Sequence, residues 1–220
     1  MNNLHGIESG SLSDRMRGAV SLAWSIFAKK VGGELININK EASMQLQFSH
    51  ILQHLLPLIN FNKGEKLQLE LETGVKVDSS TREIDVRVNG WTEQVEKPHR
   101  IAVELKCYRT IASSGGKRGA TDIFMKDVYE DLALLERYVE SDHADVGIAL
   151  VMTDMKRFVH PKSKEAKCWH YDISDNAEFG PINLDTPIGG KPVSIRLQKK
   201  YELKWIQHGE FWFLEIEGKI

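Results

Sequence analysis

Three charged residues on two neighbouring segments have the types and spacing of a hydrolytic metal site. Asp85 lies within residues 82–88, and Glu104 and Lys106 lie within residues 101–107. Carboxylate oxygens suit Mg²⁺, which often takes only one or two of them from a protein and keeps water and phosphate oxygens in its other positions. A lysine beside such a cation could hold the attacking water. The three residues therefore indicate metal-assisted attack of water on a phosphate ester.

Apolar and polar residues alternate in both segments, as expected for half-buried strands. If the strands pair antiparallel with Val88 opposite Ile101, Asp85 falls roughly opposite Glu104 on one face. Opposed residues have Cβ atoms about 4.5–5.5 Å apart, and like charges in these positions destabilise the pair. The strand period of two adds Lys106 to the same face. A bound cation would relieve the repulsion between two carboxylates arranged in this way.

Each of the three residues also has an ordinary structural explanation. Acidic residues often lie on the solvated face of an amphipathic strand. A Glu-x-Lys sequence is common by chance, because alternation sets charged residues on one face of a strand. The combination of Asp85, Glu104 and Lys106 on one face, within a suitable order of elements, favours a functional site.

The elements that must position these residues follow from periodicity and capping signals. We expect a first helix over 11–31 with a capping-box-like start at Ser11 and Asp14, and a second helix from the N-cap Asn39 to Pro57. Strands are expected over 66–78, with a bend at Gly74, and then over 82–88, 101–108 and 146–152. A crossover helix with Thr121 as its N-cap runs to about Val139 and precedes the last strand. Its acidic residues indicate a solvated face: Asp127, Glu130, Asp131 and Glu136.

The last third of the chain gives a weaker pattern. Residues 154–192 contain several prolines and glycines and are expected to be mostly loop, whereas alternation from Val193 onward predicts a meander or hairpin. We therefore expect a single α/β domain over 1–220, with its core at about 39–152 and a C-terminal β-rich extension over 153–220.

Composition limits the classes of protein and partner. A net charge of −2 argues against binding of polyanions through bulk positive charge, so a nucleic-acid surface would have to be a local patch. Two cysteines cannot build a disulfide framework, and no segment has the character of a signal peptide or a membrane span. A cytoplasmic location without membrane association is therefore expected.

The order helix, three strands, helix, strand, with Asp on the second strand and Glu-x-Lys on the third, resembles the core of the PD-(D/E)XK phosphodiesterases. The matching sequences are Ile84-Asp85-Val86 and Val103-Glu104-Leu105-Lys106, and the resemblance covers about 39–152. The residue before Asp85 is Ile where the family pattern has Pro, a departure that the family tolerates. The resemblance implies a restriction-endonuclease-like αβββαβ core, in which a mixed central sheet is flanked by helices.

The same resemblance implies roles for individual residues. Asp85 and Glu104 would ligate Mg²⁺, for which Mn²⁺ would substitute, and the main-chain carbonyl of Leu105 would add a ligand. Lys106 would position or deprotonate the attacking water and stabilise the charge that develops on the phosphate. The leaving group would be the 3′ oxygen. A further glutamate from the helix before the first strand would correspond to Glu41, with Gln45 as the alternative.

Three basic residues are candidates for contacts with backbone phosphates. Lys117 and Arg118 follow the active-site strand in the Gly/Ser-rich loop 113–119, which lacks the spacing of a phosphate-binding loop and is expected to be a flexible connector. Lys126 lies on the crossover helix and could point toward the site.

The sequence as a whole predicts a magnesium-dependent deoxyribonuclease that cuts DNA as an endonuclease. A restriction or defence role and a homodimer that cuts both strands would suit this activity, and any methyltransferase or motor partner is unspecified. The first alternative is a nucleic-acid-binding or assembly module that keeps the nuclease fold without catalysis. The second is an unrelated α/β protein in which the three charged residues are ordinary surface.

Overall fold

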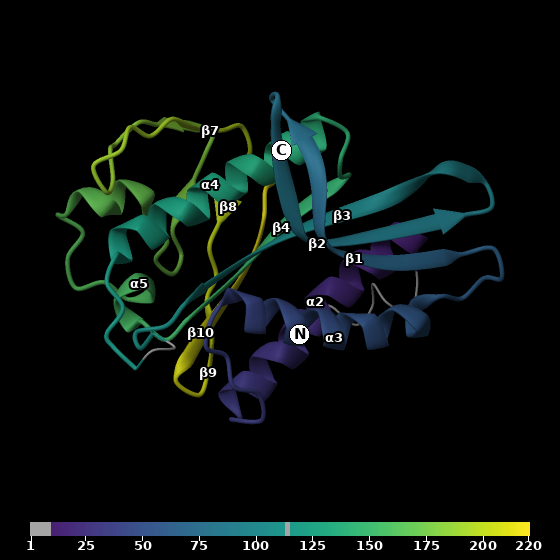
Figure 1. Ribbon diagram of the computed structural model, residues 1–220, viewed down its shortest axis with the longest axis horizontal. Helices are drawn as coiled ribbons and strands as arrows, with labels where there is room; N and C mark the ends of the chain where they lie inside the picture. Colours follow the sequence, from purple (N-terminus) through teal and green to yellow (C-terminus); the bar gives the residue numbers. More distant parts are fainter. Residues whose placement is uncertain (1–9, 113–114) are drawn as a thin grey trace.

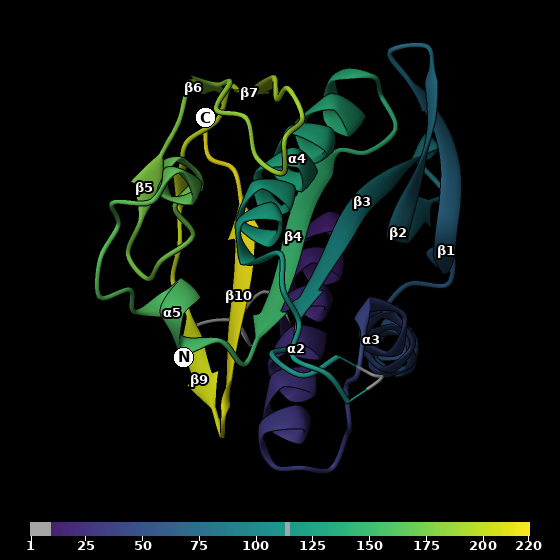
Figure 2. The same ribbon diagram turned by 60° about the vertical axis from the view of Figure 1, so that its left-hand side comes forward.

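A six-stranded sheet forms the centre of the protein, with α-helices on both faces (Figures 1 and 2). The computed structural model describes residues 10–112 and 115–220. The helices are α2 (Leu12–Gly32), α3 (Glu41–Leu55), α4 (Thr121–Glu140) and α5 (Lys156–Val159), with 3₁₀ turns η1 (Leu56–Ile59) and η2 (Lys167–Tyr171). The strands are β1 (Lys66–Val77), β2 (Ser80–Thr92), β3 (Val95–Tyr108), β4 (Val146–Thr153), β5 (Glu178–Phe179), β6 (Ile182–Leu184), β7 (Ile195–Leu197), β8 (Tyr201–Glu202), β9 (Ile206–His208) and β10 (Phe211–Glu217).

The sheet is mixed, and its strand order is β1-β2-β3-β4-β10-β9. β3 and β4 are parallel and are joined through α4, whereas every other neighbouring pair is antiparallel. The predicted α/β class with a mixed central sheet is therefore confirmed. The predicted C-terminal β structure is also present, and β10 and β9 continue the central sheet from β4 (Figure 2).

The alternation along β3 assigns its side chains to two separate cores. Leu105 and Cys107 belong to the core beneath α2 and α3. Ala102 and Tyr108 belong to the core that α4 covers on the opposite face. Because side chains of a strand alternate between faces, Glu104 and Lys106 share the α4 face. The sequence therefore places both charged residues under the crossover helix.

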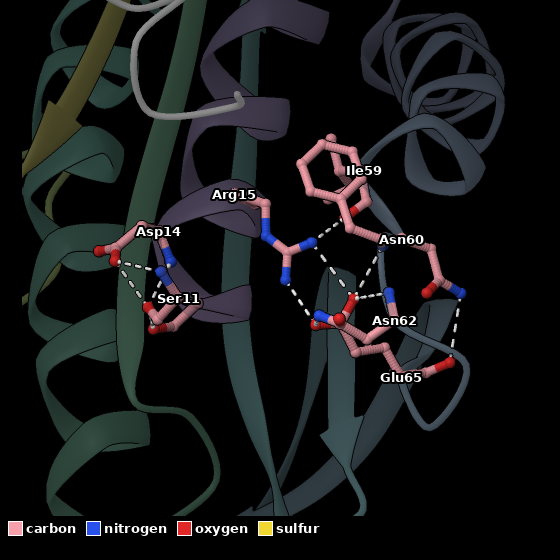
Figure 3. Close-up of polar contacts among 9 residues, drawn as sticks. Ser11, Asp14, Arg15, Ile59, Asn60, Asn62 and Glu65 are labelled. Carbon is pink, nitrogen blue, oxygen red and sulfur yellow. Dashed lines mark hydrogen bonds and ion pairs between the residues drawn. The ribbon is translucent and has the colours of Figure 1, made fainter. Parts of the chain in front are cut away.

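A buried ion pair fixes the segment that enters β1 against α2 (Figure 3). The Arg15 guanidinium lies 2.6 Å from Oε1 of Glu65 and donates a second hydrogen bond to the Ile59 carbonyl. Glu65 also accepts hydrogen bonds from the backbone amides of Phe61 and Asn62. This bonding holds the pKa of Glu65 at about 2, with the Arg15 guanidinium as the main cause. The start of the β1–β2 hairpin is thereby tied to the first helix.

The start of α2 agrees with the sequence prediction, whereas the starts of α3 and α4 do not. The cap of α4 is Ala120, and the expected cap Thr121 is the first residue of the helix. Ser11 caps α2 and shares a capping box with Asp14. The cap of α3 is Lys40 and not Asn39, because Ser43 accepts hydrogen bonds from the amides of both residues and starts the helix one position later. Within residues 10–112 and 115–220, no helix has the length and apolar character needed to cross a membrane.

Candidate catalytic site

The pairing of β2 with β3 has the register expected from the sequence. Val88 lies opposite Ile101, and the ladder continues to the pair Val86 and Val103. Asp85 and Glu104 are the next residues beyond that pair, and the two strands separate there. The predicted juxtaposition of Asp85 and Glu104 therefore lies where β2 leaves β3.

The pairing of β2 with β1 is also interrupted at Asp85 and resumes at Ile84. The β1–β2 ladder includes Leu71 with Val86 and Thr73 with Ile84, but it omits Glu72. Glu72 has a φ of +51°, in the left-handed region that non-glycine residues seldom adopt. The expected bend at Gly74 therefore gives way to a local distortion at Glu72, directly across from the candidate site.

Side chains replace the lost backbone pairing around Asp85. Its carboxylate Oδ2 accepts a hydrogen bond of 2.7 Å from the Leu105 amide. Its main-chain carbonyl accepts one of 2.8 Å from Nε2 of Gln45, which also donates to Glu72. Gln45 lies on α3, so this helix positions the Asp85 backbone through an amide side chain.

The edge of β3 beyond Val103 presents its backbone groups to this site. The Leu105 amide donates to Asp85, and the Cys107 amide donates to Oε2 of Glu41 at 3.3 Å. The amide and carbonyl of one strand residue point toward the same edge. The Leu105 carbonyl consequently points toward the side on which Asp85 lies, as a main-chain ligand would require.

Glu104 is a buried carboxylate with an unsatisfied oxygen. It is 6% exposed, and its Oε1 has no hydrogen-bond partner among the described residues. Burial raises the pKa of Glu104 well above its ordinary value, and Asp85 and Asp131 raise it further, whereas Lys106 and the Tyr138 hydroxyl partly oppose the shift. A buried polar atom without a partner is costly, so it suggests a ligand or ion that completes the site.

Lys106 is held in its charged form by two carboxylates. Its ammonium lies 3.1 Å from Oδ2 of Asp131 on α4 and 3.8 Å from Oε2 of Glu41 at the start of α3. Burial alone would lower the pKa of Lys106, but Asp131 and Glu41 outweigh burial and raise it above its ordinary value. Of the two roles predicted for Lys106, this environment favours positioning of water over removal of a proton.

Asp85 and Asp131 both have raised pKa values. Burial raises the pKa of Asp85 to about 6, and Glu41 and Glu72 add to the shift, although the Leu105 amide opposes it. Burial raises the pKa of Asp131 to about 7, an effect that Lys106 only partly offsets. Several carboxyl groups therefore compete for little compensating charge, which is the condition that a bound cation relieves.

The expectation that the acidic residues of α4 form a solvated face is wrong for Asp131 and Glu136. Asp131 pairs with Lys106, and Glu136 is 5% exposed. The sequence did contain a signal for Asp131. Phe124, Val128, Leu135 and Tyr138 follow a 4-3-4-3 spacing with Asp131 at its middle position, inside the apolar stripe.

The predicted phosphate-binding residues lie at two separate places. Arg118 is near the end of β3, where its guanidinium lies over the Tyr108 ring and donates to the Cys107 carbonyl at 3.4 Å. Lys117 is exposed beside it, whereas Ser113 and Ser114 of the same loop lie outside the described residues. Lys126 pairs with Asp127 and Glu130 on α4. Its ammonium is thus not directed at the Asp85–Glu104–Lys106 cluster.

The donor set suits a hard cation held by few protein ligands. Within residues 10–112 and 115–220, no three His, Cys, Asp or Glu side chains converge closely enough to hold a metal by themselves. Glu41 contacts the Lys106 ammonium and the Cys107 amide. It does not form a ready-made three-carboxylate metal site with Asp85 and Glu104. Two carboxylates and a carbonyl match the preference of Mg²⁺, which retains several water ligands, and the unsatisfied Glu104 oxygen fits this arrangement.

Replacing Asp85 with Asn is expected to stabilise the metal-free protein at pH 8. A carboxyl whose pKa rises from 3.8 to about 6 on folding destabilises the folded state above pH 6, and this cost vanishes as the pH falls toward 4. Asn is neutral throughout, so Asp85→Asn should add about 1–2 kcal/mol at pH 8 and progressively less below pH 6. Thermal unfolding of both proteins between pH 4.5 and 8, with chelator present, measures the difference.

The exposed residue Glu165 provides a control for this pH series. Glu165→Gln removes a carboxylate outside the site and should leave the unfolding temperature nearly unchanged at every pH. A gain for Asp85→Asn that does not depend on pH would contradict the assignment of Asp85 to a cluster of competing carboxyl groups.

In comparisons with known proteins, no family model, curated protein or solved structure matches this chain.

Proposed function

We propose that this protein is a metal-dependent nuclease that hydrolyses phosphodiester bonds in DNA. The proposal rests on Asp85 and Glu104 lying where β2 separates from β3, with Lys106 two residues further along β3. A buried Glu104 oxygen has no hydrogen-bond partner among the described residues. A buried carboxylate oxygen without a partner is costly, so an unsatisfied carboxylate beside a second carboxylate suggests a cation site. The lysine beside it suggests hydrolysis over simple binding of an ion.

The order of the elements supports the same proposal. α3, β1, β2, β3, α4 and β4 follow one another as in the PD-(D/E)XK core, and the strands carry Asp85 and the Glu104-x-Lys106 pair at the corresponding positions. We accordingly propose that the fold is restriction-endonuclease-like. A fold permits many functions, so the proposed activity depends on the site and not on the topology alone.

The chain's own residues would bind and orient the reactants. Asp85, Glu104 and the Leu105 carbonyl would hold Mg²⁺, which when bound supplies charge neutralisation at the phosphate and acidifies a coordinated water. Lys106, kept cationic by Asp131, would donate hydrogen bonds to the attacking water and to the phosphate oxygens on which negative charge develops. Asp131 holds the ammonium in place without touching the substrate.

Cleavage of supercoiled plasmid and of single-stranded DNA tests the proposal. The protein should cleave with Mg²⁺ or Mn²⁺ and not with chelator. Asp85→Asn and Lys106→Met should each lower the rate at least about 10³-fold, because each removes an electrostatic contribution to the transition state. Nicked circles would indicate cutting of one strand, and linear product would indicate coordinated cutting of both.

Lys164→Met is the matched control for Lys106→Met. Lys164 forms an ion pair of 2.6 Å with Asp172 but is not part of the cluster, so its replacement should leave the rate near that of the wild type. Metal-independent cleavage, or cleavage that survives both site substitutions, would refute the proposal. DNA binding without cleavage in either metal would instead support a nuclease-fold binding module.

A further inference from the structure

A pocket of about 500 Å³ lies between the start of β2, the middle of α4 and β7. Each of the three elements contributes an arginine to its wall: Arg82 from β2, Arg137 from α4 and Arg196 from β7. Figures 1 and 2 both place β7 beside α4. The C-terminal segment lines the pocket through Ser194, Ile195 and Arg196. Residues far apart in the sequence thus bring three guanidinium groups to one cavity.

The carboxylates of the pocket already have lysine partners. Glu130 lies 2.6 Å from the Lys126 ammonium, and Asp131 lies 3.1 Å from that of Lys106. Among the described residues, no carboxylate lies within 4.0 Å of Arg82 or Arg196. The pocket therefore has guanidinium charge that the protein itself does not neutralise.

Arg137 has only a weak internal partner. Its one carboxylate contact among the described residues is Asp78 at 3.1 Å, and the Asp78 side chain is 67% exposed. An ion pair that exposed contributes little and is easily exchanged for another anion. Arg137 can therefore turn to a ligand in the pocket at small cost.

The chemistry of the lining favours phosphate over a base. A guanidinium group presents a planar fork of donors that matches two phosphate oxygens. No aromatic side chain from the described part of the chain lines the pocket, so these residues offer a nucleobase no stacking platform. Because the whole chain has a net charge of −2, a polyanion would have to bind at a local cluster of positive charge, and the three arginines form such a cluster.

The pocket adjoins the candidate catalytic site through one shared residue, Asp131. Asp131 lines the pocket and contacts Lys106. Arg82 precedes Asp85 by three residues on β2, which corresponds to about 10 Å of extended strand. At a rise of about 3.4 Å per nucleotide, this distance spans roughly three nucleotides of one DNA strand.

We propose that Arg82, Arg137 and Arg196 bind backbone phosphates of the DNA strand a few nucleotides from the phosphate that is cleaved. This inference rests on the proposed nuclease function and adds the path of the substrate to it. It also gives the C-terminal segment a role, because β7 supplies one of the three phosphate contacts.

The test is fluorescence anisotropy of a labelled 20-base-pair DNA duplex, with chelator present to prevent cleavage. The variant Arg82→Gln/Arg137→Gln/Arg196→Gln should bind about 10- to 100-fold more weakly than the wild type at low salt. The slope of log affinity against log salt should become shallower by about two to three, since each lost phosphate contact reduces it by about 0.9. The control Lys30→Gln/Arg157→Gln/Lys162→Gln removes the same charge from exposed positions outside the pocket and should keep the wild-type slope.

The two proposals fail in different ways. Wild-type protein that cleaves DNA while the arginine variant binds with unchanged affinity and slope would overturn the pocket assignment and leave the nuclease intact. Arginine-dependent binding without metal-dependent cleavage would support the pocket and overturn the nuclease. Absence of duplex binding by the wild type would overturn the pocket assignment. If the triple variant fails to fold, Arg82→Gln and Arg196→Gln, both at exposed positions, should each reduce the slope by about one.

Discussion

Replacement of Glu104 by Gln is expected to abolish cleavage while stabilising the metal-free protein. Gln keeps the shape of the side chain and removes a buried carboxylate that competes with Asp85 and Asp131 for compensating charge. We expect a gain of about 1–3 kcal/mol in the free energy of unfolding at pH 7. In the wild type, folding at this pH has to bury the Glu104 carboxyl either charged or with a proton taken from solution, and the neutral Gln side chain avoids this cost. The cleavage rate should fall at least about 10³-fold. Urea unfolding and plasmid cleavage measure the two effects.

Glu136 is a matched control for this substitution, because it is a glutamate of the same burial in a satisfied environment. Its carboxylate accepts hydrogen bonds from the amides of Gln198 and Lys199 and from the Tyr201 hydroxyl. Glu136→Gln should therefore destabilise the protein by about 1–3 kcal/mol, since an amide cannot accept all three bonds. Addition of Mg²⁺ should raise the unfolding temperature of Glu136→Gln, as for the wild type, but not that of Glu104→Gln. Equal destabilisation by both substitutions would make Glu104 a structural residue.

Glu65→Ala is expected to destabilise the protein strongly. It would leave the Arg15 guanidinium buried without its carboxylate partner, a change that costs about 3–5 kcal/mol for a buried pair. The backbone amides of Phe61 and Asn62, which donate hydrogen bonds to Glu65, would also lose their acceptor. Because folding lowers the pKa of Glu65 from 4.5 to about 2, the stability from this pair is present above pH 4.5 and is lost as the pH falls toward 2.

Urea unfolding at pH 7 and pH 3 measures this loss. The difference between the wild type and Glu65→Ala should be large at pH 7 and smaller at pH 3. Glu202→Ala is the control, since Glu202 forms an exposed pair with Lys204, and removing it should produce no measurable change. The double substitution Arg15→Met/Glu65→Leu should recover much of the stability, because no unpaired charge remains buried. A small effect of Glu65→Ala at pH 7 would contradict this account.

The positions of the candidate catalytic residues in the sheet could be predicted because strand periodicity determines them. Alternation places Glu104 and Lys106 on one face, and pairing Val88 with Ile101 fixes the register that brings Asp85 next to Glu104. A shift of one residue would have moved the apolar side chains out of the core. The helix–strand order around these residues follows from equally strong periodic patterns.

The supporting contacts could not be predicted, because they depend on how elements distant in sequence pack together. Gln45 reaches the Asp85 carbonyl only because α3 crosses the sheet at that point, and Asp131 reaches Lys106 only because α4 covers the other face. The distortion at Glu72 replaces a bend expected at Gly74, since composition alone favours glycine for irregular backbone. Arg82 and Arg196 had no local signal, because each is an ordinary exposed residue until β7 packs beside α4.

The raised pKa values of Asp85 and Glu104, the two proposed carboxylate ligands, have a consequence for how the protein would acquire its cofactor. Carboxyl groups that retain protons near neutrality have to release them before a cation can take their place, so loading becomes an exchange of protons for an ion. Protons then compete with the metal ion for the carboxylate oxygens. The residues that would make hydrolysis feasible would also confine it to neutral and alkaline solution.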